Sequence, residues 1–394
     1  MSEATANRGT DANTESHATR PAANCRTALL LGGCGARAAY QVGVLKAIAE
    51  IVPDGSPNPF PIVCGTSAGS INTVAMASNA KNFHLGVRRI VDVWSNFKLN
   101  HVFYSDSKNL IKRILGWAWS HFGFGKWRKG PDSLLDNEPL RKLLGTYINF
   151  ESIEESIASG DLYAYCLTSC SYTSGESTSF FDGHRDINNW KRTHREGRRA
   201  QMTLDHLMAS SAIPVVFPSV QIGDEHFGDG SMRQISPISP AVHLGADKIL
   251  IIGLRMESQL GLHEAPQHRP SLGQISGYIL DTLFLNSLYA DVERMERVNR
   301  LLDGNSASDA PLKFIDHLIV SPSQDIAEIA SKHYLKLPKP FRMALRLLGL
   351  NRGGSRRFTS YLMFIEDFCQ ELIELGYRDA MAQREELNRF LGCQ

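Results

Sequence analysis

The chain has 394 residues, of which 43% are hydrophobic and 21% charged, and its formal net charge is +1. This composition is typical of a globular protein with one large core or two smaller ones, and the near-zero charge excludes a whole-chain attraction to nucleic acid or to a membrane. No apolar run in the sequence reaches the ~18 residues that span a bilayer.

The first residues and the cysteines indicate the cellular setting. Residues 1–25 are expected to form a disordered tail, because residues 1–24 are mostly small and polar and lack the apolar segment of a signal peptide. The seven cysteines are an odd number and include no Cys-x-x-Cys motif, so we expect reduced thiols and a cytoplasmic protein. No metal or other cofactor is expected, since Cys166 and Cys170 lack further zinc ligands nearby.

The first predicted unit is a strand, a glycine-rich loop and a helix. Residues 26–31 (RTALLL) predict a short buried strand, and residues 32–38 (GGCGARA) follow it as a loop. From Ala39 onward, apolar residues recur at helical spacing, at Val42, Leu45, Ile48 and Val52.

The glycine-rich loop has two interpretations. Gly33, Gly35 and Ala38 fit a degenerate dinucleotide-binding fingerprint, but the next strand does not end in the acidic residue that would bind a ribose hydroxyl. The other role of glycine-rich backbone at a helix N-terminus is to donate N–H groups to a developing oxyanion. We favour this second role.

The second unit contains the pentapeptide Gly65-Thr66-Ser67-Ala68-Gly69, which lies between an apolar run and a helical run. A strand, a sharp turn and a helix would expose the serine at the turn, and the two glycines remove side chains that would clash there. The pentapeptide also occurs by chance, but its flanking elements favour a nucleophilic serine. Strands that alternate with helices predict a mostly parallel sheet covered on both faces, with its active site at the carboxyl ends of the strands.

A serine nucleophile needs a base within hydrogen-bond reach. In α/β-hydrolases the base is a histidine, but there the serine usually follows several strands, whereas here it follows only two. His206, His226 and His243 occur in no pattern that marks them as catalytic. Asp182 and Asp229 each precede a glycine, and the residues alone do not select one of them.

These segments resemble the patatin-like phospholipases. The resemblance covers roughly residues 26–255 and includes that family's oxyanion loop, its Gly-x-Ser-x-Gly turn, a helix-start segment of bacterial members, and the segment before its catalytic aspartate, at residues 31–41, 65–69, 133–140 and 209–218. The motifs occur in the family's order. The family's aspartate corresponds to Asp229, in the sequence Phe227-Gly228-Asp229-Gly230-Ser231.

The resemblance implies both a fold and a chemistry. The fold would be a three-layer α/β/α sandwich around a mostly parallel sheet, with residues 26–255 as the catalytic domain. Ser67 and Asp229 would form a Ser-Asp dyad, and Arg37 would brace an oxyanion loop made by the backbone of Gly33, Cys34 and Gly35. The implied substrate is a phospholipid, a lysophospholipid or another acyl-ester lipid, and nucleic acid is not an expected partner.

The sequence departs from the family pattern at two loop positions. Cys34 replaces the middle glycine of the family's triplet, and Ala38 replaces the glycine after the arginine. Neither residue tolerates positive φ well. These departures motivate an alternative function, in which the chain is a weakly active or non-catalytic module with a lipid-binding or regulatory role. A further hypothesis makes Cys34 a redox-sensitive thiol at a helix N-terminus.

Beyond residue 255 we expect a mainly helical C-terminal extension, residues 256–394, that packs on the catalytic domain. It would contain a linker, a long helix, a strand and a closing helix, at residues 263–270, 271–302, 314–320 and 358–390. Residues 109–129 and 338–357 each mix basic residues with aromatic or apolar ones. Each stretch suits either a peripheral membrane contact or a helix that covers the core, and we favour the covering helix.

Overall fold

The computed structural model describes residues 25–104, 107–122, 131–256, 272–303, 312–347, 350 and 356–392. The predicted N-terminal tail up to residue 24 and the predicted linker at 263–270 lie outside these residues. Within the described part, no helix is both long enough and apolar enough to cross a membrane.

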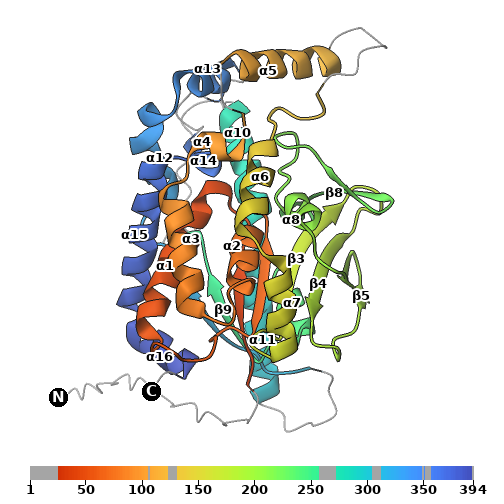
Figure 1. The fold of residues 1–394 in the computed structure, drawn as a ribbon, viewed down its shortest axis with the longest axis vertical. Helices are drawn as coiled ribbons and strands as arrows, with labels where there is room; N and C mark the ends of the chain where they lie inside the picture. The colour runs from red at the N-terminus through yellow and green to blue at the C-terminus, as the bar shows by residue number, and fades with distance from the viewer. Residues whose placement is uncertain are drawn as a thin grey trace, which may run out of the picture.

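A ten-stranded mixed sheet forms the centre of the molecule, and eight of its strands follow one another in the order β10-β9-β1-β2-β3-β4-β6-β5 (Figure 1). The five strands from β10 to β3 are parallel, and β4 pairs with β3 in the antiparallel direction. The remaining strands, β7 and β8, form a hairpin, and β8 pairs with the end of β3. The strands span Thr27–Leu31 (β1), Ile62–Thr66 (β2), Ala164–Ser171 (β3), Ser177–Gly183 (β4), Trp190–Arg192 (β5), Arg195–Arg199 (β6), Val220–Ile222 (β7), Glu225–Asp229 (β8), Lys248–Ile252 (β9) and Asp316–Val320 (β10).

Helices cover both faces of this sheet (Figure 1). In the first half of the chain they span Ala39–Ile51 (α1), Ala68–Ala77 (α2), Phe83–Ser95 (α3), Leu99–Val102 (α4), Ser107–Phe122 (α5), Glu138–Tyr147 (α6), Phe150–Ser159 (α7) and Leu204–Ser210 (α8). The later helices span Ser239–His243 (α9), Leu272–Asp281 (α10), Ser287–Asp303 (α11), Ile326–His333 (α12), Lys339–Leu347 (α13), Arg356–Tyr361 (α14), Glu366–Ala382 (α15) and Arg384–Leu391 (α16).

The buried strands explain the two cores. Every residue of β1 and β2 is buried, as expected for parallel strands with helices on both sides. Because side chains alternate along a strand, Leu29 and Leu31 point into the larger core, which α1, α3 and α15 cover, and Ala28 and Leu30 point into the smaller core with α9 and α11. The predicted three-layer α/β/α fold with a mostly parallel sheet is confirmed.

The last third of the chain completes the same sheet and the same core. The predicted strand at 314–320 is β10, which lies parallel beside β9. The predicted helix at 271–302 is present, but a π-helical segment, η4 (Thr282–Asn286), separates α10 from α11. The prediction of a single closing helix at residues 358–390 is wrong. That region forms α14, α15 and α16, and the first break brings Ser360 and Tyr361 onto the glycine-rich loop.

Helices α1 and α15 cross with their backbones in direct contact. A Cβ atom on Gly43 would overlap the carbonyl oxygen of Ile373, and one on Gly376 would overlap the carbonyl oxygen of Tyr40. Glycine is therefore needed on both sides of this crossing. It fixes the C-terminal helix on the helix that follows the glycine-rich loop.

We expect Gly43→Ala to lower the free energy of unfolding by about 2 kcal/mol, because the added methyl group overpacks this contact. Urea unfolding of the purified protein measures the change. Gly145→Ala is the matched control: its new Cβ would meet only Leu204, at 3.6 Å, and alanine is the better helix former, so stability should stay equal or rise. Equal stability of Gly43→Ala and the parent would contradict the tight crossing.

Candidate active site

Ser67 occupies a strained turn between β2 and α2. Its backbone has φ 56° and ψ −132°, a conformation that residues with a side chain rarely adopt. Gly69 makes the turn fit, since a Cβ atom there would overlap the carbonyl oxygen of Leu31 at the end of β1. Gly65 is equally confined, against Thr73 and Gly69. The turn therefore sits directly against the start of the glycine-rich loop.

A short hydrogen-bond chain holds the turn in place. The N–H of Ser67 donates to Ser210 Oγ over 3.1 Å, and Ser210 Oγ in turn donates to the carbonyl oxygen of Thr168 over 2.6 Å. The hydroxyl of Ser70 also lies 2.7 Å from Ser210 Oγ. Ser210 thus fixes the strained residue, a role that the sequence does not reveal because serine is common in such segments.

Asp229 ends β8 and lies opposite Ser169 near the end of β3. Its side chain is fully buried. The N–H of Ser231 donates to Oδ1 over 3.0 Å, whereas Oδ2 has no hydrogen-bond partner of ordinary geometry in the described residues. A buried carboxylate oxygen without a firm partner is rare in proteins and marks a candidate functional group.

The environment of Asp229 makes it a better base than a free carboxylate. Burial raises its pKa from the ordinary value of 3.8 to about 6, and hydrogen bonding by Ser67 and Ser231 opposes part of this rise. The contact with the Ser67 hydroxyl is loose, because Oδ2 lacks a well-formed bond. Such loose geometry is common for catalytic pairs in the absence of substrate.

The register of the sheet separates the two candidate aspartates. Asp229 lies beside Ser169, one residue beyond Thr168, which is the register partner of Thr66. Asp182 lies opposite Tyr165, at the other end of β3, and forms an ion pair with Arg199. Only Asp229 is therefore at the edge of the sheet that carries Ser67.

The three histidines near Asp229 in sequence do not point to a catalytic role. The ring of His206 contacts Thr203, the ring of His243 bonds to the carbonyl oxygen of Ser239, and His226 is exposed. Burial lowers the pKa of both His206 and His243, which favours their neutral forms. None of the three hydrogen-bonds to Ser67 or Asp229 in the described part of the chain.

The glycine-rich loop accommodates both of its departures from the family pattern. Only Gly35 has a positive φ, of 55°, and a Cβ there would also overlap the carbonyl oxygen of Tyr361. Cys34 has a φ of −169°, outside the left-handed region, and Ala38 is helical, with a φ of −61°. The N–H groups of Gly33, Cys34 and Gly35 donate to no acceptor within the residues described.

The thiol of Cys34 is a packing group. Its side chain is fully buried and donates weakly to the carbonyl oxygen of Gly32, over 3.5 Å. Burial raises the pKa of the thiol far above its usual value, so almost none of it is thiolate at neutral pH. The hypothesis of a redox-sensitive Cys34 is therefore not supported.

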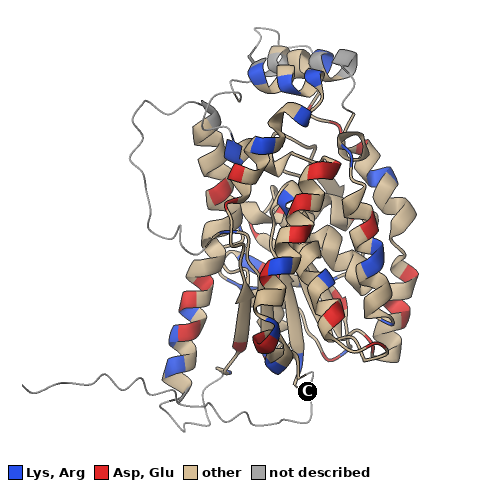
Figure 2. Cartoon of the chain, turned by 90° about the vertical axis from the view of Figure 1, so that its left-hand side faces the viewer, with Lys and Arg blue, Asp and Glu red and all other residues tan. Residues whose placement is uncertain are grey.

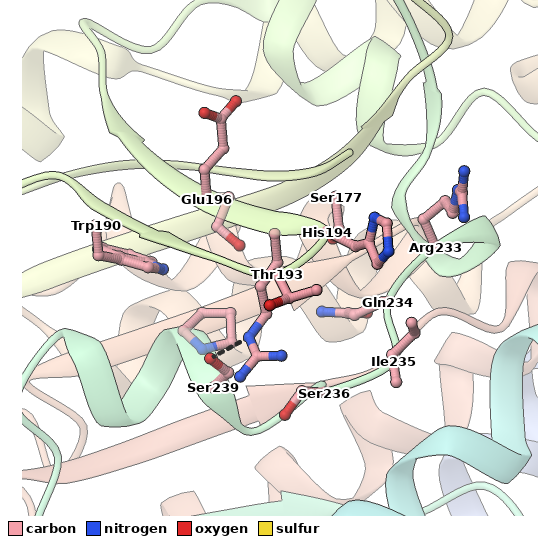
Figure 3. Close-up of a pocket in the computed structure, with 13 residues that line it drawn as sticks. Ser177, Trp190, Thr193, His194, Glu196, Arg233, Gln234, Ile235, Ser236 and Ser239 are labelled. Carbon is pink, nitrogen blue, oxygen red and sulfur yellow. Dashed lines mark hydrogen bonds between the residues drawn. The ribbon is translucent and has the colours of Figure 1, made fainter. Parts of the chain in front are cut away.

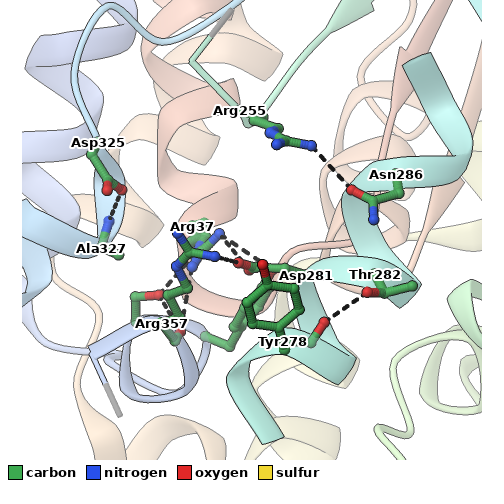
Figure 4. Close-up of polar contacts among 11 residues, drawn as sticks. Arg37, Arg255, Tyr278, Asp281, Thr282, Asn286, Asp325, Ala327 and Arg357 are labelled. Carbon is green, nitrogen blue, oxygen red and sulfur yellow. Dashed lines mark hydrogen bonds and ion pairs between the residues drawn. The ribbon is translucent and has the colours of Figure 1, made fainter. Parts of the chain in front are cut away.

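Arg37 ties the loop to the C-terminal part of the chain (Figure 4). Its guanidinium is 4% exposed and donates to Ser360 Oγ over 2.8 Å, to Tyr361 Oη over 3.2 Å and to Asp281 Oδ1 over 3.4 Å. It also lies 4.0 Å above the centre of the Tyr361 ring. The Tyr361 hydroxyl and Arg357 bond to the Asp281 carboxylate as well, so one cluster, with Arg37 and Tyr361 buried at its centre, fixes the loop.

Phe284 and Ser67 both lie beside Gly33 of the glycine-rich loop. A Cβ atom on Gly33 would lie 2.9 Å from both Phe284 Cδ1 and Ser67 Cβ and would overlap Ser231 Oγ. The Phe284 ring also stacks on Tyr361 at 5.1 Å. Ser67 itself is 1% exposed.

A separate polar pocket lies beside the turn (Figure 3). It has about 340 Å³ of empty space, part of it open to solvent, and neither Ser67 nor Asp229 lines it. The Thr66 hydroxyl donates to Oε1 of Gln234 in its wall, over 2.8 Å, and Arg195 Nε donates to Ser239 Oγ. The pocket is therefore a neighbour of the candidate active site and is distinct from it.

Comparisons with known proteins address the family. Residues 29–242, more than half of the chain, match the model of a family described as patatin-like phospholipase. Among solved structures, VipD from Legionella pneumophila is similar at 11% sequence identity, with 92% of this chain and 67% of that chain covered and a TM-score of 0.37. No curated protein matches the sequence. The matched range contains Ser67, Asp229 and the glycine-rich loop.

The buried carboxyl of Asp229 should make stability depend on pH. With a pKa of about 6 when folded and near 3.8 when unfolded, it binds its proton more tightly in the folded state, so ionisation destabilises the protein as the pH rises through this window. Asp229→Asn should therefore be more stable than the parent by about 2–3 kcal/mol at neutral and higher pH, with the gain vanishing below about pH 4.

Urea unfolding at several pH values measures this difference. The exposed Asp224 between β7 and β8 provides the control, and Asp224→Asn should follow the parent at every pH. A gain for Asp229→Asn that does not change with pH would show that its cause is packing rather than ionisation.

Proposed function

Since the chain belongs to the patatin-like phospholipase family, we propose that it is a lipid acyl hydrolase that uses Ser67 as its nucleophile and Asp229 as its base. One observation carries this proposal. The strained, buried Ser67 and the desolvated carboxyl of Asp229 lie together at the edge of the sheet where β2 ends. The substrate would be a phospholipid, a lysophospholipid or another acyl-ester lipid.

The first step would form an acyl-enzyme. Ser67 Oγ attacks the ester carbonyl carbon while Asp229 Oδ2 takes the hydroxyl proton, and the carbonyl oxygen becomes an oxyanion. A carboxylate with a pKa of about 6 accepts a proton more readily than an exposed one at ~3.9. Collapse of the tetrahedral intermediate breaks the ester bond, and Asp229 returns the proton to the departing alcohol.

The oxyanion would bind to the backbone of the glycine-rich loop. The N–H groups of Gly33, Cys34 and Gly35 have no other acceptor among the described residues, and the α1 side of the loop adds the positive end of a helix. A water molecule then attacks the acyl-enzyme, Asp229 takes its proton, and the fatty acid leaves as Ser67 regains its hydrogen. None of these steps uses a cofactor.

We further propose that residues 26–255 act as the catalytic domain and residues 256–394 as an extension that shapes its site. The contacts of Arg37 with Asp281, Ser360 and Tyr361 support this division of labour. The alternative function, a weakly active or non-catalytic lipid-binding or regulatory module, has one observation in its favour, the 1% exposure of Ser67. Such a module would bind lipid without cleaving it.

Ser67→Ala should abolish hydrolysis of a short-chain ester and labelling by a fluorophosphonate probe, because both require the hydroxyl oxygen. Asp229→Asn should lower kcat on the order of a thousandfold, since asparagine cannot accept the proton. Intact-protein mass spectrometry measures labelling, and steady-state assays measure turnover. Ser159→Ala, which removes an exposed hydroxyl at the end of α7, is the control that should retain labelling. A parent protein that neither cleaves an ester nor reacts with the probe would favour the non-catalytic alternative.

Asp281→Asn should lower kcat about tenfold with little change in KM, because it loosens Arg37 and with it the N–H groups that bind the oxyanion, without touching the acyl chain. Asp325→Asn is the matched control: Asp325 caps α12 in the same extension, and asparagine caps equally well, so both constants should stay the same. A raised KM with an unchanged kcat would place Asp281 in substrate binding instead.

A further inference from the structure

Helix α10 carries a stripe of exposed apolar side chains. Ile275, Tyr278 and Ile279 are 44%, 56% and 53% exposed, and their spacing places them on one face of the helix. Leu280 and the following Phe284 are buried and attach α10 to the core. Exposed apolar residues gathered on one helix face mark a contact surface.

The stripe lies next to the candidate active site in the chain. Helix α10 ends at Asp281, which holds Arg37, and the π-helical segment η4 that follows places Phe284 beside Gly33. A molecule bound to α10 is therefore separated from Gly33 and the candidate active site only by the short segment η4.

Two basic helices lie at the same end of the molecule. Helices α5 and α13 contact each other and form the uppermost layer in Figure 1. Neither helix contains an aspartate or glutamate, and the charged residues coloured in this layer in Figure 2 are all lysine or arginine. Among the described residues, the exposed side chains of Lys112, Lys339 and Arg346 take part in no ion pair, whereas Arg113 is paired with Asp136.

This basic layer is also apolar in part. Leu115 and Trp119 of α5 are 58% and 67% exposed, and Met343 of α13 is 54% exposed. The buried faces of the same helices hold Leu110, Ile114, Phe341 and Leu345, so both helices do cover the core, as was predicted for residues 109–129 and 338–357. Residues 123–130 of the first stretch, and residues 348–349 and 351–355 of the second, lie outside the described residues.

We propose that α10, α5 and α13 form a docking surface for an anionic lipid bilayer, and that this surface brings the membrane against the entrance to Ser67. Isoleucine, leucine and tryptophan side chains enter the interface between headgroups and acyl chains, while lysine and arginine pair with the lipid phosphates. The combination of unpaired cations with exposed apolar groups favours a lipid surface over a second copy of this chain. The proposal rests on the proposed function.

Vesicle binding tests the surface without any catalysis. The Ser67→Ala protein is sedimented with vesicles of phosphatidylcholine alone and of equimolar phosphatidylcholine and phosphatidylglycerol. It should bind the anionic vesicles and bind the neutral ones weakly. Replacing Lys339 and Arg346 by glutamine should weaken binding roughly fivefold for each charge removed. Ile275→Gln with Ile279→Gln should weaken it on the order of tenfold.

Leu301→Gln is the matched control. Leu301 is 67% exposed near the end of α11, and α11 extends to the end of the molecule opposite α5 and α13 in Figure 1, so its replacement should leave vesicle binding unchanged. Equal binding by the parent and the α10 variant would overturn the proposal. Dimers that depend on Ile275 and Ile279, seen by light scattering without vesicle binding, would overturn it too.

Hydrolysis separates this proposal from the function on which it rests. With Ser67 intact, the Ile275→Gln, Ile279→Gln variant should cleave a water-soluble short-chain ester at the parent rate but cleave phospholipid in anionic vesicles about tenfold more slowly. Equal rates on vesicles would overturn the docking surface. No cleavage of either substrate by the parent would overturn the hydrolase, while the binding result would still decide the surface.

Discussion

The buried guanidinium of Arg37 is the constraint on which the rest of the structure depends. A charge that is 4% exposed must be neutralised and hydrogen-bonded, because an unpaired buried charge destabilises a fold by several kcal/mol. Asp281 supplies the opposite charge, and Ser360, Tyr361 and the carbonyl oxygen of Arg357 accept the remaining hydrogen bonds. The fold must therefore return its C-terminal part to the glycine-rich loop, and β10 and the α1–α15 crossing secure that return.

Strain and burial are concentrated at the edge of the sheet where β1 and β2 end. The turn at Ser67 and the desolvated carboxyl of Asp229 each reduce stability. The surrounding parallel strands are fully buried and provide the compensating rigidity. This distribution is typical of sites whose groups must be held ready in a geometry that they would not adopt alone.

Much of this site could be predicted from the sequence because it follows from local patterns. Ser67 and Gly33 to Gly35 lie in segments whose glycines and flanking apolar runs predict strand, turn and helix. The choice of Asp229 over Asp182 required the family motif. The sheet register now gives a physical reason for that choice, because only Asp229 lies at the edge of the sheet that carries Ser67. The partners of Arg37 were not predictable, since Asp281 and Tyr361 lie 244 and 324 residues away with no motif around them. The need for glycine at position 35 was not predictable either, because it depends on the close packing of this residue against Tyr361.

The long separation within the Arg37 cluster has a consequence for biosynthesis. A ribosome makes the serine turn and the glycine-rich loop early, and both can begin to fold beside β1 and β2. Arg37 has no anionic partner from this cluster until residue 281 has emerged, and the aromatic ring above which it lies comes 324 residues after it. A nascent chain thus carries the strained turn at Ser67 long before it carries the brace for the loop, and the cluster around Arg37 can close only after residue 361 has been made.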